Sequence, residues 1–311
     1  MDDKRKWYAR PWFIVVVVLL LVSVAGLFAR LGGIEVAVNE AAYVRPPAGP
    51  VEFTACTYNV QGRPWFDDTK HKFTGISPLL NRFDIVGVQE CFKDHARLWA
   101  QADHPVKVYH SQLKHVRKIV GSGLGILGKY PLVSTEAINF DALGEFQNWP
   151  ASKGVLMARF DVGGMMLDVY TTHIEAGKSP EAMQAKVGQG EEMVAMVRKH
   201  SPPEHSVIFM GDFNMRPSRG PEDKEANKDN AKVYVFDNFR DALGLRDAAD
   251  EINGPVGEEI DRILFRAGTG HTMTALSWQH DDPAFYDAAK VPLSDHEPVF
   301  VKFRIAPKAG A

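Results

Sequence analysis

"IFMGDFNMRPS", residues 208–218, places two polar side chains at the end of an apolar run. The run before Asp212 is typical of a buried strand, and Pro217 follows soon after. Successive strand residues point to opposite faces of a sheet, so Asp212 and Asn214 would lie side by side where the strand leaves the core. Asp and Asn are also common turn residues. The stretch therefore predicts either a plain turn or half of an active site.

Short apolar runs alternate with helical patterns along most of the chain. Residues 51–60, 84–90 and 155–173 have the pattern of strands, and the last of these runs is split by a Gly-Gly pair typical of a hairpin. Residues 180–199 predict a helix that Pro180 opens after Ser179 as its cap. This mixture indicates an α/β or α+β domain with sheet inside and helices outside.

One glycine pattern could indicate either a cofactor-binding loop or a strand. "GLGILG", residues 123–128, fits the G-x-G-x-x-G spacing of dinucleotide-binding loops. Such a loop must open a helix, but Pro131 disfavours helical geometry at the residue before it. We therefore predict a strand at this position and no dinucleotide site.

The composition is that of an ordinary globular protein. The chain has 311 residues and a formal net charge of −3, and its pI is near 6.4. The basic excess typical of nucleic-acid binding proteins is missing, which weighs against a nucleic-acid partner. Its length fits one large domain or two small ones.

The N-terminus predicts export. A basic segment, residues 4–10, precedes an uncharged apolar stretch, Trp12–Phe28, long enough for a single-span anchor or a cleaved signal peptide. In both cases basic residues stay in the cytoplasm and the remainder lies on the periplasmic or extracellular side. We expect residues 1–30 to be the anchor or signal, 31–50 a linker rich in Pro, Gly and Ala, and 51–311 the catalytic domain.

Carboxylate, amide and imidazole groups recur at the ends of predicted strands. Taken one at a time, each is more often a cap, a turn or a hydrogen-bonded structural residue. Taken together, they form a set suited to a metal and to proton transfer. Its members are Asn59, Glu90, His173, Asp212, Asn214, Asp261, Asp295 and His296.

The chemistry of this set favours hydrolysis of a phosphate ester. Oxygen donors suit a hard cation such as Mg²⁺, for which Mn²⁺ or Ca²⁺ could substitute. The two imidazoles could move a proton and stabilise charge during attack by water on phosphorus.

The motifs "TYNV", "QE", "GDFN" and "SDHEPV", in this order, resemble the endonuclease/exonuclease/phosphatase superfamily related to DNase I. "SGLGILGKYPL", "KGVLMARF" and "LDVYTTHIEAG" are most similar to neutral sphingomyelinases and related phospholipase C-like members. The resemblance covers residues 51–305. It implies a DNase I-like four-layer α/β sandwich, in which two mixed β-sheets pack face to face with helices outside.

The resemblance also implies a role for each polar residue. Glu90 and Asn59 match metal-site residues, with Asp295 beside the metal. His296 matches a catalytic histidine oriented by Asp261. Asp212 and Asn214 match the catalytic "GDxN" pair, and His173 and Asn214 would donate hydrogen bonds to the phosphate. Either Asp212 or His296 could take the proton from water, and the motifs leave both open.

Three substrate classes remain open. The subfamily-like motifs and the predicted anchor favour a phospholipid head-group phosphodiester, as in sphingomyelinases. A nuclease of the same superfamily and a phosphomonoesterase are the alternatives. We expect a monomer, and we expect Cys56 and Cys91 to be free thiols, because they lie about four positions out of register if Asn59 and Glu90 meet.

Overall fold

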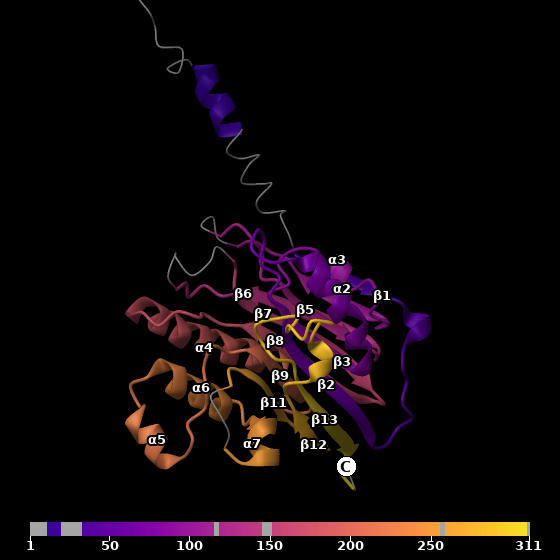
Figure 1. Cartoon of the computed structure of the whole chain (residues 1–311). Helices are drawn as coiled ribbons and strands as arrows, with labels where there is room; N and C mark the ends of the chain where they lie inside the picture. Colours follow the sequence, from indigo (N-terminus) through magenta and orange to yellow (C-terminus); the bar gives the residue numbers. More distant parts are fainter. Residues whose placement is uncertain (1–10, 20–32, 115–117, 145–150, 256–258, 310–311) are drawn as a thin grey trace, which may run out of the picture.

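The computed structural model describes residues 11–19, 33–114, 118–144, 151–255 and 259–309, and two β-sheets form its centre (Figure 1). The first sheet has seven strands in the order β1-β4-β5-β3-β2-β13-β12. Their bounds are Ile34–Val38, Val106–His110, Leu124–Gly128, Ile85–Gln89, Val51–Asn59, Val299–Pro307 and His271–Gln279.

The second sheet has six strands in the order β10-β11-β9-β8-β7-β6. Their bounds are Arg246–Asp247, Asp261–Arg266, Ser206–Asp212, Met165–His173, Gly154–Val162 and Leu132–Asn139. The pairs β2–β3 and β8–β9 are parallel, whereas the other paired strands are antiparallel. Both sheets are therefore mixed, as predicted.

Helices cover the outer faces of the two sheets (Figure 1). The helices α2 to α7 span Thr69–Leu79, His95–Leu98, Pro180–His200, Pro221–Ala226, Ala231–Ala242 and Ala248–Asn253. Three short 3₁₀ helices, η2 to η4, span Glu40–Ala42, Leu80–Arg82 and Pro283–Phe285. The Ser179 side chain caps α4 by accepting from Ala182 N at 3.2 Å, as the sequence predicts.

Apolar residues at alternate positions of one strand belong to different hydrophobic cores. In β2, Phe53 and Ala55 belong to the core between the sheets, whereas Cys56 and Tyr58 belong to the core beneath α2. A third core lies beneath α4 and α6 on the second sheet. Strands covered on both faces favour apolar residues at consecutive positions, which explains runs such as residues 85–88 and 207–210. The predicted four-layer sandwich is confirmed.

The glycine pattern at 123–128 forms strand β5 and opens no helix. A Cβ built on Gly128 would lie 2.4 Å from a ring carbon of Phe160 in the facing sheet. Close approach of the two sheets, and not a cofactor, therefore requires this glycine.

The predicted linker needs correction. Within residues 31–50, strand β1 pairs with β4, and Val44 N donates to Lys129 O at 2.8 Å. This segment is therefore hydrogen-bonded to the domain and is not a free tether.

Residues 11–19 are helical, but among the described residues no helix is long and apolar enough to cross a membrane. The rest of the predicted anchor or signal, residues 1–10 and 20–30, lies outside the described residues.

Both cysteines are buried and free, as predicted. In the parallel pairing of β2 with β3, Cys56 lies opposite Val86, five residues before Cys91. The strand register therefore keeps the two sulfur atoms apart.

Candidate active site

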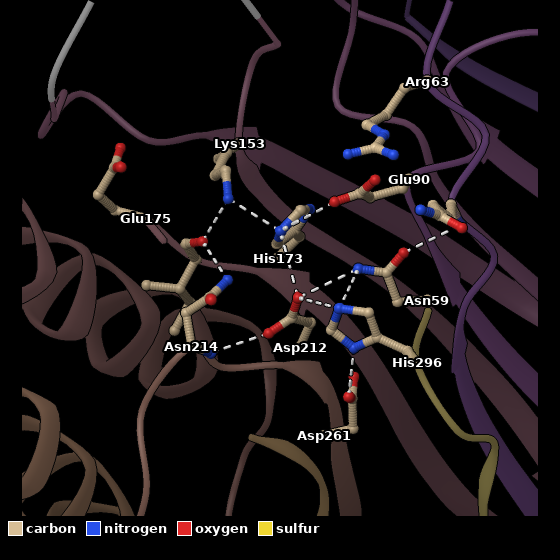
Figure 2. Close-up of polar contacts among 12 residues, drawn as sticks. Asn59, Arg63, Glu90, Lys153, His173, Glu175, Asp212, Asn214, Asp261 and His296 are labelled. Atoms are coloured by element: carbon tan, nitrogen blue, oxygen red, sulfur yellow. Dashed lines mark hydrogen bonds and ion pairs between the residues drawn. The ribbon is translucent and has the colours of Figure 1, made fainter. Parts of the chain in front are cut away.

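The strand register brings the predicted polar residues to one edge of the two sheets (Figure 2). His173 at the end of β8 lies opposite Asp212 at the end of β9, and Asp212 lies opposite Asp261 at the start of β11. In the facing sheet, Asn59 ends β2 and Glu90 directly follows β3. The ends of strands from both sheets thus bring their polar side chains to one site.

Asp212 is the centre of the cluster. It is buried, and its Oδ2 accepts from Asn59 Nδ2 at 3.1 Å. The same oxygen lies 3.4 Å from His173 Nε2 and 3.9 Å from His296 Nε2. Asp212 therefore links the two sheets and faces both histidines.

Asn214 reaches the site by a turn. Strand β9 ends at Asp212, and Asn214 has a left-handed φ of 45°. Its backbone N donates to Asp212 Oδ1 at 2.9 Å, and its Nδ2 donates to Ile174 O at 3.1 Å. Asp212 and Asn214 are neighbours as predicted, but the predicted reason is wrong. A turn brings them together, and not the alternation of side chains along an extended strand. The turn and the site are one structure.

His296 and Asp261 form a closely bonded pair. His296 Nδ1 lies 2.6 Å from Asp261 Oδ2. Burial alone would lower the pKa of His296, but the hydrogen bond and charge of Asp261, together with the charge of Asp212, raise it to about 10. Burial and the charge of Asp212 raise the pKa of Asp261. The pair therefore retains a proton, with Nε2 of the ring directed toward Asp212 and Asn59.

Lys153, which the sequence reasoning did not select, lies beside His173. Lys153 Nζ is 2.8 Å from His173 Nε2 and donates to Ile174 O at 2.5 Å. Burial, followed by the charge of Lys153, lowers the pKa of His173 well below its usual value. Burial also lowers the pKa of Lys153, although the charges of Asp212, Glu175 and Glu90 oppose this. The neutral form of His173 is therefore favoured, and its Nε2 can accept from the Lys153 ammonium, whose charged form is favoured by Asp212, Glu175 and Glu90. In this contact Nε2 is an acceptor and not the predicted donor to a phosphate.

Glu90 takes a left-handed backbone conformation with a φ of 56°. This conformation is uncommon for a residue that is neither Gly, Asn nor Asp, and such strain gathers at functional sites. Its Oε1 lies 3.8 Å from His173 Nε2. Burial raises the pKa of Glu90, although the charge of Lys153 opposes this. A buried carboxylate of this kind would be stabilised by a divalent cation.

The oxygens of Glu90 and Asn59 fit Mg²⁺, because both are hard donors next to an aqueous edge. Asn59 Oδ1 accepts from Gln61 N at 3.1 Å and keeps a second lone pair. Asp212, Asp261 and His296 form another possible group, with ligand atoms within 4.8 Å of one another. There, however, Asp261 already bonds His296 and Asn59 already bonds Asp212. The first pair therefore fits a metal better.

Asp295 is placed at the margin of the site. It is exposed, and its backbone N donates to Gln61 Oε1 at 3.2 Å. The neighbouring Ser294 donates to Asn59 O at 2.6 Å and thereby holds this loop against β2. No described contact joins the Asp295 carboxylate to Glu90 or Asn59, so its role beside a metal stays a prediction.

Comparisons with known proteins agree with this architecture. Residues 56–296 match the endonuclease/exonuclease/phosphatase family. A sphingomyelinase of Mycobacterium tuberculosis is 28% identical over 279 residues, covering 81% of this chain and 52% of the relative. Human sphingomyelin phosphodiesterase 2 is 25% identical over 269 residues, covering 77% of this chain and 61% of the relative. The chain thus spans between 52% and 61% of the length of these relatives.

Solved structures share the fold. Sphingomyelinase C from Streptomyces griseocarneus superimposes with a TM-score of 0.57 at 20% identity, covering 81% of this chain and 99% of that chain. D. rerio TDP2 complexed with a single-strand DNA product gives a TM-score of 0.59 at 18% identity, covering 81% of this chain and 98% of that chain. The family match covers most of the sequence, and the resemblance of its motifs is confirmed. The chain belongs to the endonuclease/exonuclease/phosphatase family.

Proposed function

We propose that this chain is a Mg²⁺-dependent phosphodiesterase that hydrolyses the head-group phosphodiester of a phospholipid, in the manner of a sphingomyelinase. The observation that carries the chemistry is the convergence of the His296–Asp261 pair and the His173–Lys153 pair on Asp212, beside Glu90 and Asn59. The similarity to sphingomyelinases over about four fifths of the chain supports the lipid substrate.

Glu90 and Asn59 would hold the cation. When bound, Mg²⁺ supplies positive charge that offsets negative charge on the phosphate oxygens and lowers the pKa of nearby imidazole. Lys153 would add a second positive charge beside the phosphate, with His173 holding its ammonium group in place at 2.8 Å. Fixed charges of this kind stabilise a transition state because they need no reorganisation.

Water attack requires a proton acceptor, and the site offers two. His296 presents Nε2 while Asp261 fixes the opposite nitrogen at 2.6 Å. Asp212 presents a buried carboxylate between the histidines. We assign the acceptor to His296, because Asp212 already receives hydrogen bonds from Asn59 Nδ2 and Asn214 N. Without a cation the pKa of His296 is raised to about 10, so His296 would accept a proton only where the charge of a bound cation lowers that pKa. Asp212 then positions these donors and the water.

Parallel assays on one preparation test this proposal. We expect Mg²⁺-dependent release of phosphocholine from sphingomyelin vesicles, no nicking of plasmid DNA and no release of phosphate from a phosphomonoester. His296→Ala and Glu90→Ala should each reduce the turnover number by orders of magnitude while the far-UV circular dichroism spectrum is unchanged. Nicking without lipid hydrolysis would select the nuclease instead, and near-normal turnover in either variant would refute the assigned roles.

We also propose that residues 1–30 anchor the protein or direct its secretion, so that the domain lies on the exported side as a monomer. The basic segment before the apolar stretch Trp12–Phe28 supports this orientation. Protease added to intact cells or spheroplasts should digest the domain, and light scattering should give the mass of one chain. Full protection from protease would contradict the orientation.

A further inference from the structure

Four exposed apolar side chains lie on segments that border the candidate active site. Trp65 and Phe66 are 74% and 70% exposed, Ile119 is 60% exposed and Leu143 is 40% exposed. We call these four residues the apolar rim. Single exposed apolar residues are ordinary, but a group of them around a site indicates an interaction surface.

Each residue of the apolar rim lies on a segment that contacts a segment carrying a site residue. The turn with Trp65 and Phe66 begins at Gly62, whose N donates to Glu90 O at 2.9 Å. Ile119 precedes Val120, which pairs with Ala151 and accepts from Ser152 N, directly before Lys153.

Leu143 is attached on the other side of the site. It precedes Gly144, where an added Cβ would lie 2.2 Å from Glu175 Oε2. Figure 2 shows Arg63 and Glu175 on opposite sides of His173. The rim therefore flanks the site from both sides.

The aromatic turn is rigid, although its tip is exposed. The Arg63 guanidinium donates to both oxygens of Asp67, at 2.9 Å and 3.2 Å, and closes the turn that carries Trp65 and Phe66. Lys72 Nζ lies 3.3 Å from Asp67 Oδ1. The backbone of the turn thus needs little further ordering on binding, which lowers the entropic cost of association.

We propose that the apolar rim inserts into the head-group region of a lipid bilayer and thereby holds the active site against the membrane surface. This proposal rests on the proposed lipid substrate. Trp and Phe favour the membrane–water interface, and aliphatic side chains add buried apolar area there. Stacking on bases of single-stranded nucleic acid would use the two aromatic rings but not Ile119 or Leu143. The net charge of −3 also favours lipid over nucleic acid.

A fluorophore at the rim tests the contact directly. Cys56 and Cys91 are buried, so a thiol-reactive, polarity-sensitive dye should label the single cysteine of Trp65→Cys selectively. In the full chain, with phosphatidylcholine vesicles and a chelator to prevent hydrolysis, we expect a blue shift and quenching by spin-labelled lipid. Leu276→Cys, on an exposed position of edge strand β12, is the matched control and should show neither change. Because the dye reports its own surroundings, attachment through the N-terminal segment alone would not produce the signal.

A kinetic assay separates this proposal from the proposed function. The double substitution Trp65→Ala and Phe66→Ala should lower kcat/KM on sphingomyelin vesicles at least about tenfold, since burying one large apolar side chain is worth about 1.5–3 kcal/mol. Hydrolysis of soluble bis(p-nitrophenyl) phosphate should stay unchanged. If the dye remains in water while the wild type hydrolyses vesicle lipid, the proposed membrane insertion of the apolar rim is refuted and the proposed function is not. Dye insertion without lipid hydrolysis would refute the function alone, whereas a response to a single-stranded oligonucleotide but not to vesicles would overturn the rim as a lipid contact.

Discussion

Replacing Asp261 by Asn tests whether Asp261 acts on His296 or binds the metal. The substitution keeps the size of the side chain but removes the charge that bonds His296 Nδ1 at 2.6 Å. Breaking a buried ion pair costs about 3–5 kcal/mol. Because each 1.36 kcal/mol changes a rate tenfold, we expect the turnover number to fall about 10²- to 10⁴-fold if that loss falls on the transition state. The asparagine amide would also favour the tautomer whose Nε2 carries the proton, which cannot accept one from water.

The assay is a titration of turnover with Mg²⁺. For Asp261→Asn, we expect the half-saturating Mg²⁺ concentration to stay within about threefold of the wild type while the plateau falls. Glu90→Gln is the matched control, since it also neutralises one carboxylate. Its half-saturating concentration should rise at least about tenfold, because an amide binds Mg²⁺ more weakly than a carboxylate. Recovery of Asp261→Asn activity at high Mg²⁺ would refute the reasoning and support a metal held by Asp212, Asp261 and His296.

Three further substitutions test the site and the fold. Lys153→Met should lower kcat/KM about 10²- to 10³-fold with the melting temperature nearly unchanged, and normal activity would contradict its role as a charge for the phosphate. Gly128→Ala should lower the free energy of unfolding in urea by about 1–3 kcal/mol, because its methyl group would meet Phe160; an unchanged midpoint would contradict this close packing. Burial lowers the pKa of His104 to about 4, although its bond to Phe83 O opposes this. The folded state thus binds fewer protons than the unfolded state between pH 4 and 6.5, and stability falls by up to about 3 kcal/mol as the pH falls through that window. His104→Gln should flatten that part of the stability–pH curve, and an unaltered slope would refute this explanation.

The sequence predicted most of the site because its residues follow strands with strong patterns. The runs before Glu90 and Asp212 are apolar on consecutive positions, and those before Asn59 and His173 are mostly buried, since both faces of these strands are covered. Strand ends that share a sheet edge bring their polar residues together without any knowledge of the loops. Strand β1 was not predicted, because its sequence pattern is weaker. Strand β1 is apolar at four of its five residues, but it is short and every residue is exposed on an edge strand, so it lacks the pattern of one buried and one polar face. Its neighbours are rich in Pro, Gly and Ala, and the whole segment therefore has the composition of a linker.

Lys153 and the apolar rim could not be predicted in this way, because their significance depends on contacts between distant segments. Lys153 precedes a strand like many surface lysines, and only the register that sets Gly154 opposite His173 brings its ammonium group to the imidazole. Likewise, Trp65 and Phe66 are ordinary core residues by type, and only the structure shows them exposed on the turn that the Arg63–Asp67 bond closes. Both features change the interpretation of Asp212. Its carboxylate faces a lysine as well as two histidines, at a site bordered by the exposed side chains of the apolar rim. In the proposed function, that combination would suit a phosphate carried by an apolar molecule better than the phosphate of a fully hydrated polyanion, because the same surface offers charge to the phosphate and apolar contact to the rest of the substrate.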